Sequence, residues 1–167
     1  MFDEFATYQA LPPIDTDVWA DRDLLDGLIE MSRVRAKMDA DELAMVGAVD
    51  ARQAYSLDGS VTTASWLAAH TQVSIGSARA KVKTARALRR LDRLRGAMDQ
   101  GQVGFEQARV LTRYSNLRTD EAMARDEEML VGFAKTLPTD DLAIVMRRWV
   151  MEVDSEGRDP GDREKKK

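Results

Sequence analysis

The stretch SWLAAHTQVSIGSARAKVKTARALRRLDRLR, residues 65–95, decides the fold that we expect for this chain. Residues 66–82 within it have the layout of a helix-turn-helix, with a short helix, a turn and a second helix. We expect Val73 to be buried in the turn and Ser74 to cap the second helix by accepting a backbone N–H bond. Many such turns have glycine where Gln72 stands. Glutamine takes a left-handed conformation only at some cost, so we expect a turn that is looser or differently shaped.

The rest of the chain is also helical in pattern, and the alternating runs typical of strands are nearly absent. We predict an all-α fold, a single bundle-like domain of six or seven helices over residues 16–153, with the helix-turn-helix-like unit embedded in it. The domain would begin with one long helix, or with two helices broken near Met38. Residues 1–15 are predicted to be a flexible lead-in, and residues 154–167 a disordered charged tail.

A continuous helix is predicted from about Ser74 toward Asp99, ended by the glycines that follow. Basic side chains recur along it at steps of four and three residues, which would place them in one stripe about 80° wide. The stripe consists of Arg79, Lys83, Arg86, Arg90 and Arg93. Such a stripe can follow a phosphate backbone, but it can equally be a solvated face or pair with acids of the N-terminal helices.

Charge is distributed unevenly along the chain. Residues 79–95 carry eight Lys/Arg and one acid, whereas residues 1–50 carry twelve acids and four bases. The second helix of a helix-turn-helix enters the major groove with its N-terminal residues at the bases. The candidate DNA contacts are therefore Ser77 and Arg79 for base edges, beside Ile75, and the stripe Arg79, Lys83, Arg86, Arg90 and Arg93 for phosphates.

The chain has no cysteine and one histidine, His70. Disulfides and thiolate chemistry are excluded, and no second imidazole can join His70 in a metal site or a charge relay. We interpret His70 as a partly exposed residue at a helix end, and we predict no catalytic residue, metal or cofactor. No run approaches the roughly 20 apolar residues that span a bilayer, so we expect a cytoplasmic protein with no membrane partner.

Apolar residues recur at heptad-like positions in the N-terminal helical region. They are Leu28, Met31, Met38, Met45 and Val49. We expect the methionines to fill the core, because methionine adapts to irregular gaps between helices; a homodimer seam is the alternative. Trp66 and Trp149 are expected to be core anchors, and Trp19 to hold the start of the first helix.

Four motifs together resemble a known family. They are DGSVTTASWLAAHTQVS (58–74), ARALRRL (85–91), GQVGFEQARVL (101–111) and LPTDDLAIVMRRW (137–149). In this order, between about Trp19 and Asp154, they resemble the bacterial domain of unknown function 222, which commonly precedes an HNH endonuclease domain. The resemblance implies an all-helical N-terminal domain without catalytic residues of its own, because the nuclease residues belong to a C-terminal domain that we expect to be missing here.

We therefore predict a noncatalytic domain that binds or targets double-stranded DNA for an HNH-endonuclease-like protein. The alternative is a helical oligomerisation or protein-interaction domain without nucleic-acid contact. The surroundings of Arg86, Arg90 and Arg93 should discriminate between the two. Side chains that project together into solvent, away from the acids of residues 1–50, favour DNA, whereas side chains buried in salt bridges to Asp21, Asp23, Glu30 or Asp39 favour the alternative.

Overall fold

The structure is a computed structural model that describes residue 6 and residues 10–156. Within these residues it contains eight α-helices, two short 3-10 helices and no strand, which confirms the all-α prediction. None of these helices is both long enough and apolar enough to cross a membrane. The chain divides into two units, residues 1–31 and 32–167, and each is described by itself.

The first unit contains the 3-10 helix η1 (Thr16–Val18) and the beginning of α2 (Asp21–Arg52). Trp19 lies directly against Gly27, because a Cβ built at Gly27 would come within 2.7 Å of the indole atom Cζ3. This contact across the first two turns fixes the entry of the chain into α2, as expected for Trp19.

α2 is one continuous helix, so the alternative of two helices broken near Met38 is wrong. Within the second unit the helix buries Ala36, Ala40, Leu43 and Val46. The predicted heptad-like apolar positions are not part of this buried face, since Met38 is 45% exposed and Met45 is 50% exposed. The prediction that these methionines fill the core is therefore wrong. The face of α2 that packs inward combines two alanines, which let neighbouring helices approach closely, with the larger Leu43 and Val46.

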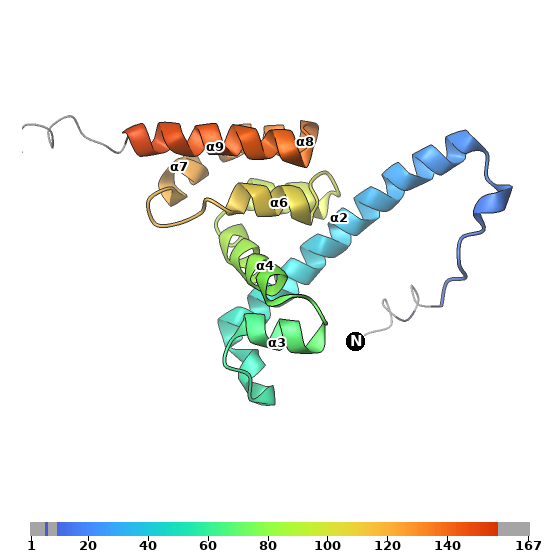
Figure 1. The fold of residues 1–167 in the computed structure, drawn as a ribbon, viewed down its shortest axis with the longest axis horizontal. Coiled ribbons are helices and arrows are strands. Elements are labelled where there is room, and N and C mark those ends of the chain that lie inside the picture. The colour runs from blue at the N-terminus through green and yellow to red at the C-terminus, as the bar shows by residue number, and fades with distance from the viewer. Residues whose placement is uncertain (1–5, 7–9, 157–167) are drawn as a thin grey trace, which may run out of the picture. The chain divides into compact units, whose positions relative to one another are not determined.

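The other helices of the second unit are shorter (Figure 1). They are η2 (Ala54–Asp58), α3 (Thr63–His70), α4 (Ile75–Leu88), α5 (Asp92–Asp99), α6 (Phe105–Thr112), α7 (Asp120–Arg125), α8 (Glu127–Thr136) and α9 (Thr139–Glu156). The closest neighbours are α3 with α4, α6 with α9, and α4 with α6. α9 continues to Glu156, beyond the predicted start of the tail at residue 154, and residues 157–167 lie outside the described residues.

The segment expected to form a helix-turn-helix-like unit consists of α3, a turn and α4. Gln72 has a φ of 57°, so it adopts the left-handed conformation in spite of the cost for a residue other than glycine. The hydroxyl of Ser74 accepts the Ser77 N–H at 3.1 Å, which confirms Ser74 as the cap of α4. Val73 is half-buried rather than buried and packs against the core. Local chemistry therefore sets both ends of this turn, and the contacts of α3 with α4 fix its shape.

The continuous helix predicted from Ser74 to Asp99 is wrong, because α4 ends at Leu88 and α5 begins at Asp92. The start of α5 is capped from a distant part of the chain. A carboxylate oxygen of Glu127 accepts the backbone N–H groups of Arg93 at 2.9 Å and of Leu94 at 3.0 Å. These bonds satisfy the free donors at the start of α5, so the helix can begin anew there.

The end of α5 requires glycine for two reasons. Gly101 has a φ of 69°, and its N–H donates to the Met98 carbonyl at 2.8 Å, while the Gln102 N–H donates to the Ala97 carbonyl at 2.9 Å. This is the hydrogen-bond pattern of a Schellman cap. A Cβ at Gly101 would also come within 2.7 Å of the Arg33 carbonyl oxygen of α2, so no larger residue fits without a shift.

Candidate nucleic-acid interface

Four of the six candidate DNA contacts line one groove of the second unit, with a volume of about 620 Å³. Arg79, Lys83 and Arg86 reach it from α4, and Arg90 from the turn that follows. Hydroxyl side chains complete the lining, from the start of α3 and from the loop after α6. They are Thr62, Thr63, Ser65 and Ser115. In protein–DNA contacts, phosphate oxygens accept hydrogen bonds from basic groups and hydroxyls such as these.

Two of the four cations in this basic groove have no carboxylate partner among the described residues. Arg79 is exposed and forms no ion pair within the described part of the chain. Lys83 donates from Nζ to the backbone carbonyl of Arg113, at the end of α6. That bond orients the ammonium group without neutralising its charge, so both side chains keep a full positive charge for an anionic ligand.

Arg86 is held by a buried acid. Its Nε and Nη2 each lie 2.8 Å from an oxygen of Asp50, a two-pronged pair, and the Thr63 hydroxyl donates to the same carboxylate at 2.9 Å. The hydrogen bond from Arg86 keeps the pKa of Asp50 below its ordinary value although burial opposes this. The same bond raises the pKa of Arg86. The Asp50 side chain is 10% exposed and that of Arg86 is 62% exposed, so the carboxylate is inside and the guanidinium faces the groove.

Arg90 and Arg93 are also paired with acids, but they lie in different places. Arg90 lines the basic groove, and its Nη1 lies 2.6 Å from an oxygen of Asp120. Arg93 lies on α5, outside the groove lining, and its Nη2 is 3.2 Å from an oxygen of Glu128. Both side chains stay more than half exposed. The single stripe predicted along one helix is therefore wrong, because the break before α5 separates Arg93 from the rest.

Ser77 does not line the basic groove either. It is half-buried in the first turn of α4, where its backbone N–H is used by the Ser74 cap. Arg79, which lies one helical turn after Ile75 at the start of α4, is exposed. Of the two side chains expected at base edges, the structure leaves Arg79 the more accessible.

The acids that pair with the arginines differ from those expected. The expected partners were Asp21, Asp23, Glu30 and Asp39, whereas the observed ones are Asp50, Asp120 and Glu128. Sequence analysis missed Asp50 and Asp120 because their partners are 36 and 30 residues away, and no local pattern marks such pairs. The arginines are thus neither free nor buried: each has an acid on one side and solvent on the other.

His70 is exposed at the last position of α3. Its ring stacks on Trp66, with 4.6 Å between ring centroids and 15° between planes, and Nδ1 lies 2.9 Å from the Trp66 carbonyl oxygen. This agrees with the interpretation of a residue at a helix end. In the described ranges, no three histidine or acidic side chains come together in a way that could hold a metal ion.

Comparison with known protein families matches residues 25–167 to the family described as Domain of unknown function (DUF222). The match covers the whole second unit and agrees with the motif resemblance. Neither the curated proteins nor the solved structures that were compared contain a match to this chain.

Proposed function

The chain belongs to the family described as Domain of unknown function (DUF222), and from that premise we propose that its second unit is a noncatalytic module that binds double-stranded DNA. One observation carries the proposal: the fold brings Arg79, Lys83, Arg86 and Arg90 to one groove, although the helix that carries the first three ends before the fourth. Asp50 and Asp120 offset two of the four positive charges, and the positive charge that remains at the groove favours a polyanion.

The four cations would act differently toward a phosphate. Among the described residues Arg79 and Lys83 are paired with no carboxylate, so they can bind a phosphate without breaking an ion pair. They should therefore contribute most to counterion release. Arg86 presents five N–H donors in a fixed fork and gives only part of them to Asp50. Its remaining donors can bind a phosphate while Asp50 keeps the side chain oriented. Arg90 is placed in the same way by Asp120.

Sequence preference would come from the start of α4. Phosphate contacts fix position, whereas base edges in the major groove supply specificity. Arg79 is the exposed side chain suited to a guanine edge, and Ile75, 44% exposed, can contact a thymine methyl. We also propose that the module positions an HNH nuclease domain of a longer protein, so that any cleavage chemistry would lie in that domain.

The proposal is tested by fluorescence anisotropy with a labelled duplex of about two helical turns, at several salt concentrations. Log K should fall linearly with log salt, by about 0.9 for each phosphate contacted, which gives a slope near −3 for three to four contacts. The double variant Arg79→Gln/Lys83→Gln should bind more weakly and flatten the slope by about 2. Its matched control is Arg147→Gln/Arg148→Gln, which removes the same charge from exposed positions of α9 outside the groove.

The two variants separate specific placement from general charge. If the α9 variant loses as much affinity as the groove variant, binding depends on net charge alone and the groove is not the site. If the unaltered chain binds no duplex even at low salt, the DNA proposal fails and the protein-interaction alternative replaces it. Plasmid incubated with the same preparation and Mg²⁺ should remain uncut.

A further inference from the structure

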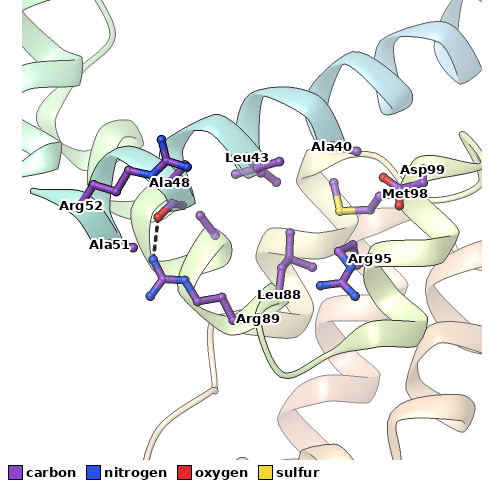
Figure 2. A pocket seen from close by; sticks show the side chains of 13 residues that line it. Ala40, Leu43, Ala48, Ala51, Arg52, Leu88, Arg89, Arg95, Met98 and Asp99 are labelled. Carbon is purple, nitrogen blue, oxygen red and sulfur yellow. Dashed lines mark hydrogen bonds between the residues drawn. The ribbon is translucent and has the colours of Figure 1, made fainter. Parts of the chain in front are cut away.

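A second groove, of about 390 Å³, lies between α2 and the helices α4 and α5 of the second unit (Figure 2). Leu43, Leu88 and Met98 are its buried apolar lining. The lining residues contributed by α2 include a row of small ones. They are Ala40, Ala44, Gly47, Ala48 and Ala51. None of the cations of the basic groove lines this apolar groove.

The groove is hollow because of those small side chains. A Cβ built at Gly47 would be 3.9 Å from Ala85 across the groove, an ordinary contact distance, so the two walls are close at that point. Residues 40–51 of α2 extend over roughly 16 Å at 1.5 Å per residue. A space of this volume falls in the range of sites for small molecules, at about 300–1,000 Å³. At Gly47 and Ala85 its walls are too close for a helix, which with its side chains is about 10 Å wide.

The charges at the two ends of the apolar groove differ (Figure 2). Arg52 and Arg89 lie at one end, and Arg95 and Asp99 at the other. Arg89 donates from Nη2 to the Gly47 carbonyl at 2.6 Å. Arg52 is exposed, and across the described residues it makes no ion pair or side-chain hydrogen bond. At the opposite end, Arg95 is paired with Asp92 at 2.7 Å beside the acid Asp99.

We propose that the apolar groove binds an elongated small-molecule anion, with a hydrocarbon body and one terminal carboxylate. The carboxylate lies between Arg52 and Arg89, and the hydrocarbon extends over Leu88 toward Met98. The charge difference between the ends fixes this direction. Arg52 makes no ion pair in the described part of the chain, and Arg89 is only 3.7 Å from its acid Asp50, whereas the other end already holds the Arg95–Asp92 pair and Asp99. The proposal does not require that the chain bind DNA, since the apolar groove has its own lining residues, and Asp50 alone contacts a cation of each groove.

The test uses decanoate as the probe, below its micelle concentration, with 1-decanol as the neutral comparator of equal chain length. Binding to the full chain is followed by NMR shifts of the leucine and methionine methyl groups. Ala48→Trp fills the groove and should abolish binding of both probes, whereas the matched control Ala124→Trp, at an exposed position of α7 outside the groove, should leave both unchanged. Arg52→Gln should weaken decanoate about tenfold and leave decanol unaffected, as the loss of one charge-assisted hydrogen bond requires.

Three outcomes would overturn the proposal. The first is that decanoate does not bind the unaltered chain. The second is that Ala48→Trp, with its helical circular dichroism intact, binds as well as Ala124→Trp. The third is that Arg52→Gln weakens the binding of decanoate and of decanol equally, or changes the binding of neither. If Ala48→Trp does not fold, Arg52→Gln decides alone, because Arg52 is exposed and its replacement disturbs no packing.

Discussion

α2 and α9 carry apolar residues at similar helical spacing, yet they bury different parts of them. On α9 the buried face holds large side chains, with Leu142 and Met146 fully covered and Trp149 in the core. In the second unit α2 buries Ala36, Ala40, Leu43 and Val46 and leaves Met38 and Met45 about half exposed. Helical periodicity therefore predicts that an apolar face exists, but tertiary contacts decide which apolar side chains the rest of the fold covers.

The contacts explain the difference. α9 packs against α6, and the Trp149 Nε1 donates to an oxygen of Asp126 at 2.9 Å, so the indole is both buried and hydrogen-bonded. On α2 the alanine face is turned to α4 and α5, where it leaves the apolar groove. The methionine face is open within the second unit. Four sets of substitutions test this account of the packing.

The largest effect is expected for Trp149→Ala on α9. Removing a buried tryptophan side chain should lower the free energy of unfolding by about 3–5 kcal/mol. It also leaves Asp126 without one of its donors. Urea unfolding followed by circular dichroism measures the change. A loss below 1 kcal/mol, which is the range of surface positions, would mean that α9 is not part of the core.

A smaller effect is expected where α5 meets α2. Gly101→Ala forces a side chain into a left-handed backbone position and against the Arg33 carbonyl, so it should cost about 1–3 kcal/mol. The matched control is Gly96→Ala inside α5, where a Cβ would meet nothing within 4 Å. That change should stabilise the helix by up to about 1 kcal/mol. Equal effects in the two variants would contradict the proposed contact of Gly101 with α2.

The third change concerns the acid that joins α2 to α4. The pKa of Asp50 is lowered in the folded chain, so its contribution to stability is present above its unfolded pKa of about 3.9 and is lost as pH falls through the folded value. Asp50→Asn should therefore be less stable than the unaltered chain near neutral pH, and the difference should shrink on acidification below pH 4. Urea titrations from pH 6 to pH 2.5 measure it. A difference independent of pH would show that charge on Asp50 is not the cause.

The smallest effect is expected on the methionine face of α2. Met38→Gln/Met45→Gln should change the free energy of unfolding by no more than about 0.5 kcal/mol per site, as at other surface positions. Sedimentation of the same samples tests the oligomerisation alternative. Self-association that disappears in the double variant would assign this face to a second copy of the chain, whereas a large loss of stability in a monomer would show that the chain covers it.

Sequence analysis was most successful where short-range chemistry decides the structure. Ser74 was identified as a cap and Trp149 as a core anchor, because each depends on neighbours in the sequence or on one helical face. The family resemblance was also correct. The break between α4 and α5 could not be predicted, since it depends on Glu127, 34 residues beyond Arg93.

The candidate site was predictable only in part, for the same reason. Arg79, Lys83 and Arg86 share a helix, so their proximity follows from spacing alone. Arg93 was wrongly joined to them because the predicted helix was too long. The acids that restrain Arg86 and Arg90 come from other elements, and only the tertiary fold identifies them.

Asp50 belongs to the surroundings of both grooves. It binds Arg86, which lines the basic groove, and lies 3.7 Å from Nη2 of Arg89, which lines the apolar one. An anion that draws Arg89 away from Asp50 would leave that carboxylate more firmly bound to Arg86, and so less of Arg86 free for phosphate. If both grooves bind as proposed, the two ligands should be negatively coupled. Thermodynamic linkage then requires that duplex DNA weaken the binding of decanoate by the same factor by which decanoate weakens the binding of DNA. Equal decanoate affinities with and without duplex would show that Asp50 does not couple the two grooves.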